Sequence, residues 1–495
     1  MNDNTEQAFP VSEVLTRKRF LQFLLILIIP VGIVAPFLSA ISVLDVAMAA
    51  GGIFLLWVAF QRPEIFFVLA LWTNFLKAVY IPKLDFGKYG VAPYMLFTAL
   101  AVVGYGFQVI TGRKKIIIPP GFLFLLIFIG GTTISSLFVH DLRMTFGVYV
   151  RDVLQWLLFF LAIQMVSNRQ NLKHLVDALL AQALVVISWG IITGLQINYL
   201  GIYKSKLLFW RQFQKNEYAT YLAFILVLSL ATISVSLGKK AKLRKYIAFV
   251  LILLVPIAWM FTYSRSGFLG IISALFFFLV LDRGKKILRL LLRWGPIIVF
   301  IALVLIFAFS SEARDLAIDG VMSLITPLSA SSEALNSNVE KRIELLSTAL
   351  EIIIEHPISG IDYSQWLEYA PLESTHYDAQ LGETVVVGLT VHNRYLSIAV
   401  KSGLISLAGY LGFLFVVFRS GVRARRYAEN WLRIYINVFL AAFAGYQIAL
   451  LFLPVFLWEW PILGILLGLV NIAGLENKDN SVKKIRFKLL GMRND

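Results

Sequence analysis

Residues 246–281 read YIAFVLILLVPIAWMFTYSRSGFLGIISALFFFLVL. Two apolar runs, 246–263 and 266–281, meet at a short polar turn in this stretch. An apolar run of about 17 to 25 residues crosses the roughly 30 Å hydrocarbon layer of a bilayer as a helix, because a helix satisfies its backbone polar groups internally. The stretch therefore predicts two membrane-spanning helices joined by a tight turn.

Similar apolar runs recur along the whole chain. Of its 495 residues, 59% are hydrophobic and only 15% are charged, whereas about 25% are charged in a typical soluble domain. This composition excludes a water-soluble globule and predicts an all-α integral membrane protein. We predict about 14 transmembrane helices, at residues 20–38, 41–60, 64–82, 91–110, 121–138, 148–166, 174–197, 217–237, 246–263, 266–281, 290–309, 393–418, 433–451 and 458–473.

The basic residues indicate the orientation. The net charge is +16, but the basic clusters fall between apolar runs and form no single soluble face, which argues against nucleic acid as a partner. With both termini in the cytoplasm, about two thirds of the 45 lysines and arginines lie in inward loops, as the positive-inside rule requires. Arg17-Lys18-Arg19 precede the first run without a convincing cleavage site, so we expect that run to remain as a span. The predicted location is the plasma (inner) membrane.

The predicted domain organisation has four parts. They are an N-terminal transmembrane bundle at 1–309, an extracytoplasmic lid loop at 310–391, C-terminal transmembrane helices at 392–473 and a cytoplasmic basic tail at 474–495. The lid loop holds 13 Asp and Glu residues against three Lys and Arg, so it is not a membrane segment. Because it is long for a connector, we interpret it as a partly helical lid packed on the outer membrane face.

One helix is predicted inside the lid loop. Asn338 can cap a helix from Val339 to about Glu355, and His356-Pro357 ends it. The residues expected to form its apolar face are Ile343, Leu346, Leu350 and Ile354. The segment Leu328–Ser337 is rich in Ser, Ala and Asn and is expected to be flexible.

Composition also excludes several kinds of site. The chain has no cysteine, so it has no disulfide, no thiolate nucleophile and no cysteine metal site. The side chains of Glu373, His376 and Asp378 are of types that bind metal ions, but the chain shows no HExxH or paired-aspartate pattern. We therefore predict neither a metal nor a cofactor.

Arg265 is the most informative polar residue near the predicted outer surface. An arginine between two apolar spans costs about 2 to 3 kcal/mol if it enters the hydrocarbon, so it needs an anionic partner. Its neighbours Ser264, Ser266 and Gly267 are small and allow close approach. The alternative is an interfacial arginine that reaches toward lipid headgroups.

Arg211 lies in the predicted outer loop at 198–216. Its aromatic context, Phe209-Trp210-Arg211-Gln212-Phe213, fits an interfacial anchor as well as it fits a ligand site. Together with Lys204, Lys206 and Lys215 it makes this outer loop basic, whereas most lysines and arginines of the chain lie in the inward loops. A basic patch beside the membrane suits a lipid-linked phosphate, and a guanidinium binds phosphate oxygens bidentately.

His392 opens the span after the lid loop. An imidazole there can exchange protons at neutral pH, although a structural histidine is an equal alternative on residue type alone. Asn393 is positioned to orient the ring, and Arg394 follows it. Asp45, near the outer end of the second span, is a further candidate acid or base, with a helix cap as the simpler interpretation.

Three motifs together resemble one family. Thr262-Tyr263-Ser264-Arg265-Ser266-Gly267 precede an apolar helix, and His392-Asn393-Arg394-Tyr395-Leu396 are followed by Gly403-Leu404-Ile405 and Tyr410-Leu411. Between them, Arg342-Ile343-Glu344-Leu345 leads through Ala349 to His356-Pro357-Ile358-Ser359-Gly360. In their order and spacing, over roughly Arg211 to Leu411, these motifs resemble the O-antigen ligase and polymerase superfamily.

The resemblance implies a GT-C-like membrane glycosyltransferase. Such an enzyme moves a glycan from a polyprenyl diphosphate carrier to a glycan or lipid acceptor at the outer membrane face, without a nucleotide sugar or a metal. It implies that Arg211 and Arg265 hold the diphosphate and that His392 activates or orients the acceptor hydroxyl. Around Arg211 the chain departs from the family, since Arg211-Gln212-Phe213-Gln214-Lys215-Asn216 stands in place of Gly and Asn-Pro-Asn. The expected substrate-binding residues are Arg265, Arg211, Lys215, Asn393, Ser264, Ser266 and Arg342.

Simple chemistry agrees with this activity. A diphosphate is a good leaving group, so the protein has mainly to place the acceptor and stabilise the charge that grows on the departing phosphate. Two arginines can stabilise that charge, and a neutral imidazole can accept the hydroxyl proton. Two alternatives stay open: a transporter of polysaccharide or lipid-linked glycan, and a metal-dependent polyprenyl-sugar glycosyltransferase that uses Asp45. A transporter predicts polar residues at mid-depth in several spans, and few occur here, such as Lys77 and Lys401 near span ends.

Overall fold

The structure is a computed structural model that describes most of the chain. The described residues are 43–76, 84–86, 89–91, 93–137, 142–199, 215–235, 241–260, 262, 264–282, 333–361, 366, 369, 373–378, 383–388, 391–453 and 458–489.

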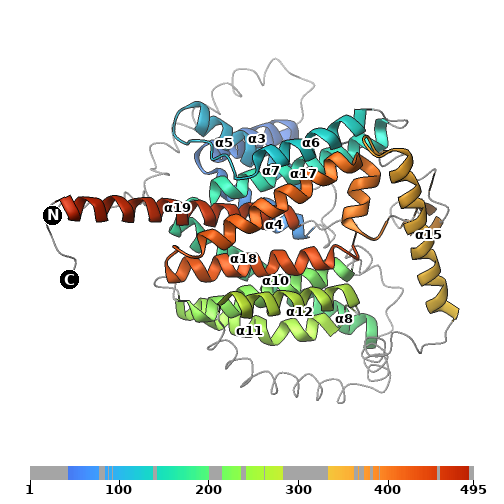
Figure 1. The fold of residues 1–495 in the computed structure, drawn as a ribbon. Helices are drawn as coiled ribbons and strands as arrows, with labels where there is room; N and C mark the ends of the chain where they lie inside the picture. The colour runs from blue at the N-terminus through green and yellow to red at the C-terminus, as the bar shows by residue number, and fades with distance from the viewer. Residues whose placement is uncertain are drawn as a thin grey trace. The chain divides into compact units, whose positions relative to one another are not determined.

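Helices dominate the described residues (Figure 1). They are α3 (Val43–Gln61), α4 (Pro63–Leu76), α5 (Pro93–Ile110), α6 (Phe122–Leu137), α7 (Leu142–Met165), α8 (Arg169–Tyr199), α10 (Lys215–Ser234), α11 (Ala241–Met260), α12 (Arg265–Asp282), α15 (Glu333–Glu355), α17 (Arg394–Ala424), α18 (Asn430–Ala449) and α19 (Glu459–Leu489). Two short antiparallel hairpins accompany them, Leu84–Phe86 with Tyr89–Val91 (β1 and β2) and Glu373–Asp378 with Glu383–Gly388 (β3 and β4). The sequence analysis predicted neither hairpin.

The helices confirm a helical membrane protein. Six described helices are long and apolar enough to cross a membrane, and the bent pair Gly51–Gln61 and Pro63–Asn74 would add a seventh. The helices Phe122–Leu137 and Ser266–Leu281 are apolar but shorter. The predicted spans at 20–38 and 290–309 lie outside the described residues, so the count of about 14 stays a prediction.

The chain divides into two compact units, and the smaller one comprises residues 1–63 and 103–114. In it, α3 packs against the C-terminal part of α5. The Gln108 side chain donates to the carbonyl of Phe60 at 3.2 Å, and the rings of Phe60 and Phe107 stack with centroids 4.6 Å apart. A Cβ on Gly104 would collide with the carbonyl of Ala59, so the missing side chain allows the two helices to meet.

The larger unit, residues 64–102 and 115–495, contains the other helices. Small residues bring its helices into close contact, as expected where lipid supplies no hydrophobic driving force. Gly445 of α18 packs against Gly270 and Ala274 of α12, and Gly409 of α17 packs against the backbone of α6 at Phe124 and Phe128.

Buried polar side chains link further helices of this unit. Trp72 of α4 donates to the carbonyl of Ala178 on α8 at 3.1 Å, and Gln182 of α8 donates back to the carbonyl of Leu71 at 3.2 Å. Gln155 of α7 donates to Asn74 at 3.1 Å. Because an unpaired amide is costly inside a membrane, these bonds fix which faces of the helices meet.

Three basic residues gather at one end of the helices, which we call the basic end. Arg244 of α11 forms an ion pair with Asp177 of α8, Arg169 lies 4.8 Å from the ring centroid of Trp431 at the start of α18, and Arg425 donates to the carbonyl of Leu281 at the end of α12. All three belong to loops that the positive-inside rule assigned to one side of the membrane. We call the opposite end, where α18 ends at Ala449, the site end.

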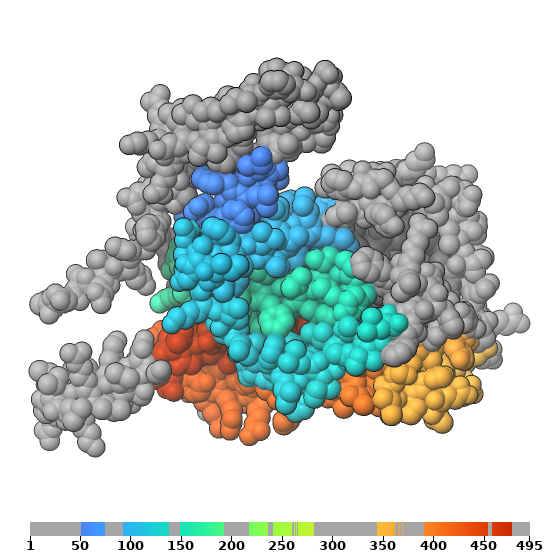
Figure 2. Space-filling model, turned by 90° about the horizontal axis from the view of Figure 1, so that it is seen from above, coloured from blue at the N-terminus to red at the C-terminus, as the bar shows by residue number. Residues whose placement is uncertain are grey.

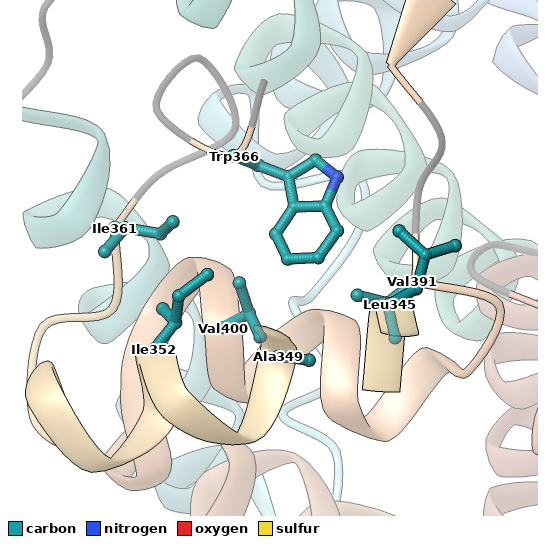
Figure 3. Close-up of a cluster of buried hydrophobic side chains, with 7 residues drawn as sticks. All are labelled: Leu345, Ala349, Ile352, Ile361, Trp366, Val391 and Val400. Carbon is teal, nitrogen blue, oxygen red and sulfur yellow. The ribbon is translucent and has the colours of Figure 1, made fainter. Parts of the chain in front are cut away.

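The lid helix α15 lies at the site end, beside the first half of α17 (Figure 1). Its buried face packs against α17. Figure 2 shows the two helices as neighbours at the surface. The buried cluster in Figure 3 comprises Leu345, Ala349, Ile352, Ile361, Trp366, Val391 and Val400. Leu346, Leu350 and Ile354 of the predicted apolar face are exposed, and the residues that pack on the protein belong to the adjacent stripe, which was not predicted.

The helix also begins earlier than predicted. It starts at Glu333, so Asn338 lies inside it and is not its cap, and residues 333–337 of the expected flexible segment are helical. Its end at Glu355, before His356-Pro357, is confirmed.

The turn that follows α15 is docked on a bend in α17. At Gly403 the backbone leaves the helical region, with φ 77° and ψ 172°, and the two halves of α17 run in different directions (Figure 1). The amide of Leu404 donates to the carbonyl of Pro357 at 2.7 Å, and the amide of Ile361 donates to the carbonyl of Val400 at 2.8 Å. Two backbone groups released by the bend, the amide of Leu404 and the carbonyl of Val400, are therefore satisfied by the lid.

Gly403→Ala is expected to loosen this junction. An L-residue is disfavoured at this φ, and its Cβ would collide with the carbonyl of Ile358, so the free energy of unfolding should fall by roughly 2 to 4 kcal/mol. Thermal unfolding in detergent measures the loss. Gly474→Ala on α19 is the matched control, because a Cβ there meets nothing within 4 Å and should leave stability unchanged or slightly raised. Equal stability of the two variants would contradict the proposed junction.

Candidate functional site

The helices α10, α12 and α17 begin at the site end. Gly270, near the start of α12, lies beside Gly445 and Ala449 near the end of α18, so these helices are antiparallel. Gly267 of α12 packs against Ala219 near the start of α10. The amide of Arg394, the first residue of α17, donates to the carbonyl of Leu450 at 2.9 Å. The N-termini of α10, α12 and α17 therefore lie at the same end of α18.

This arrangement places the backbones of three predicted site residues at the site end. Lys215 is the first residue of α10, Arg265 is the first residue of α12, and His392 lies two residues before α17 begins. The backbone of Arg342 is in α15. The side chains of Lys215, Arg265 and Arg342 lie outside the described residues, and so does the whole of Arg211.

Ser264 and Ser266 are buried at the start of α12. The Ser264 hydroxyl accepts the amide proton of Gly267 at 3.0 Å and lies 3.3 Å from the Ser266 hydroxyl. Ser264 thus caps α12, as a serine does at a helix N-terminus. Gly267 has no Cβ, and one would collide with Ala219, so these neighbours of Arg265 fix the start of its helix and its packing.

His392 and Asn393 precede α17 differently. His392 is exposed, as a group that meets a substrate must be. The Oδ1 atom of Asn393 accepts the amide protons of Tyr395 and Leu396, at 3.0 and 3.1 Å, so Asn393 is the N-cap of α17. The cap fixes the direction in which the chain enters the helix, and hence where His392 stands.

The sequence analysis did not identify a buried ionic group behind His392. Arg394 of α17 and Glu459, the first residue of α19, form an ion pair with 3.7 Å between Nε and Oε2. Glu459 is 1% exposed, and the Arg394 side chain is 12% exposed. The sequence did contain a signal for this group, the glutamate at the start of the last predicted span. Placing an ionisable residue within a membrane span costs free energy, so such a residue often has a function.

Hydrogen bonds extend this group to α18 and to the second half of α17. The hydroxyl of Tyr410 donates to Oε1 of Glu459, and the Gln447 amide lies 3.5 Å from the same atom. Tyr395 donates to Oε1 of Gln447 at 2.8 Å. Asp152 of α7 also interacts electrostatically with Arg394. We call Arg394, Glu459, Tyr410, Gln447 and Tyr395 the buried polar cluster.

The site end is suited to an anion. A helix N-terminus carries a partial positive charge, and the N-termini of α10, α12 and α17 meet here with the positions of Lys215 and Arg265. Within the part of the chain that the structure describes, no group of three His, Asp or Glu side chains could hold a metal ion. Asp45 lies in the first turn of α3, in the smaller unit, and its side chain is outside the described residues.

Comparison with known families identifies one region of the chain. The family described as O-antigen ligase matches residues 247–411, which are a third of the chain. The matched region contains Arg265, Arg342, His392 and the bend at Gly403, and it excludes Arg211 and Lys215. No curated protein matches the chain. Residues 247–411 of the chain are therefore similar to the O-antigen ligase family, which supports the resemblance that the sequence motifs indicated.

Proposed function

We propose that this protein transfers a glycan from a polyprenyl diphosphate carrier to an acceptor hydroxyl, at the site end and without a metal ion. The acceptor is a growing glycan or a lipid. The observation that carries the proposal is the convergence of the α10, α12 and α17 N-termini, which brings the positions of Lys215, Arg265 and His392 to one end of α18. Because the basic end lies opposite, this end is proposed to face away from the cytoplasm, with both termini inside.

Arg265 is the proposed principal ligand of the diphosphate. Its guanidinium offers a planar pair of donors that fits two phosphate oxygens, and the start of α12 adds its partial positive charge. Arg211, Lys215 and Arg342 are proposed as further cationic partners. When the bond between the sugar and the diphosphate breaks, these cations stabilise the charge that develops on the leaving phosphate.

His392 is the proposed general base. As the acceptor hydroxyl attacks the anomeric carbon, the neutral imidazole takes its proton, a contribution of about 10²- to 10⁴-fold in rate for a positioned base. The His392 side chain is exposed and stands next to the capped start of α17, so it can meet an acceptor while its backbone is held. The lid, which is bound to the bend of the same helix, is proposed to cover the reacting groups.

His392→Ala and Arg265→Ala are each expected to lower glycan transfer by at least about 100-fold, because one removes the base and the other the main diphosphate ligand. The assay incubates purified protein with a polyprenyl diphosphate glycan and separates elongated glycan from glycan moved to another acceptor. Arg265→Lys should recover little activity, since an ammonium lacks the bidentate fork. Normal transfer by either alanine variant would refute the site assignment.

Asn393 is expected to act through its cap. Asn393→Ala should reduce the free energy of unfolding by about 1 kcal/mol and slow transfer, because the start of α17 loses a hydrogen-bond acceptor. Asn393→Ser should retain both properties, since serine caps helices nearly as well. Detergent unfolding and the transfer assay measure the two effects. A serine variant that is stable but inactive would show that Asn393 contacts substrate through its amide.

Chelation distinguishes the proposal from a metal-dependent mechanism that uses Asp45. Excess EDTA during purification and assay should leave the transfer rate unchanged, because cationic side chains neutralise the diphosphate here. Asp45→Asn should likewise leave the rate unchanged. A loss of transfer that added Mg²⁺ or Mn²⁺ restores would overturn metal independence.

A further inference from the structure

The buried polar cluster is not explained by the stability of the fold. Arg394 and Glu459 are 3.7 Å apart, beyond hydrogen-bond length, and Arg394 Nε and Glu459 Oε2 have no hydrogen-bond partner among the described residues. Two charges removed from water recover their desolvation cost only when their geometry is good and their remaining polar atoms are paired. An apolar pair of similar size would be expected to stabilise this position at least as well.

The place of Arg394 also contradicts the usual electrostatics of a helix. A helix N-terminus favours anions, and Arg394 puts a cation on the first residue of α17. Glu459, in contrast, fits the N-terminus of α19. Sequence choices that violate local rules without a gain in stability concentrate at functional sites.

The cluster connects four segments that determine where His392 stands. Arg394 lies before the bend at Gly403, and Tyr410 lies after it, with the guanidinium 5.8 Å from the ring centroid of Tyr410. Glu459 interacts with both, from the start of α19. Through Gln447 and the carbonyl of Leu450, the end of α18 is bound to the same first turn of α17.

We propose that Glu459 is a positioning residue, which acts through Arg394 and Tyr410 to hold the two halves of α17 at a fixed angle and so places His392 for catalysis. The lid turn contacts the outer side of the same bend, at Val400 and Leu404. This inference rests on the proposed role of His392 and adds residues outside the region that matches the family, since Glu459 follows residue 411.

The test separates positioning from stability with a double substitution. Arg394→Met together with Glu459→Met removes both charges of the pair, so neither stays buried without the other, and the thermal midpoint in detergent should equal or exceed that of the unmodified protein. Transfer should nevertheless fall about 100-fold in kcat, with KM for the donor within about twofold, because a displacement of about 1 Å at a catalytic group has this effect. A stable double variant with normal kcat would overturn the proposal.

The ion pair at the basic end provides the matched control. Arg244→Met together with Asp177→Met removes the half-buried ion pair that links α11 and α8 at the basic end, opposite the start of α17. Its kcat and KM should stay unchanged. If this control lost as much kcat as the Arg394 and Glu459 double variant, the loss would be a general effect of removing an ion pair. That result would also overturn the proposal.

A third variant keeps the test decisive if the double variant does not fold. Tyr410→Phe keeps the ring beside Arg394 and both charges, and it removes only the hydroxyl that binds Glu459. It should fold and lose about tenfold in kcat at unchanged KM, a smaller effect because the ion pair remains. Normal kcat in this variant would contradict the proposal. His392→Ala, assayed in parallel, tests the proposed function separately: if it is inactive while the cluster variants are normal, only the positioning role fails.

Discussion

At Gly403 the hydrogen-bond ladder of α17 is interrupted, and the lid supplies the missing partner: the carbonyl of Pro357 accepts the amide proton of Leu404. A bend inside a membrane helix is costly unless each released backbone group is paired. The pairing here requires the left-handed φ of Gly403 and the close approach of the turn that contains Gly360, where φ is 64°. This contact therefore joins the lid to α17, the helix that begins two residues after His392.

The same constraint organises the site. Because the first half of α17 turns away from the second half, its N-terminus meets the end of α18 at Leu450 and the start of α19 at Glu459. The starts of α10 and α12 come to the same end through the close contact of Gly267 with Ala219. Partial positive charges of several helix ends are thus concentrated where a diphosphate is proposed to bind, and the basic loops with Arg169, Arg244 and Arg425 lie at the other end.

Much of this could be predicted from the sequence, and the reasons for the failures are physical. Twelve of the predicted spans coincide with a described helix. Their positions could be predicted from the length of the apolar runs, because a run that crosses the hydrocarbon layer is nearly always helical. The stripe of α15 that packs on the protein was not predicted, since that helix carries two apolar stripes and only tertiary contact decides that Leu345, and not Leu346, is buried. The hairpin β3–β4 was missed for a similar reason, since its pairing depends on partners and not on one segment alone.

At the site, motif spacing located His392 and the start of α12, but it could not reveal that Ser264 and Asn393 cap helices or that Glu459 pairs with Arg394 across 65 residues of sequence. The most direct test of the account is a cryo-electron microscopy map of the protein with a bound polyprenyl diphosphate glycan. The account predicts density for the diphosphate between the N-termini of α12 and α17, within hydrogen-bond reach of Arg265, with the sugar toward His392. Density for the diphosphate at the basic end, beside Arg244, would contradict it.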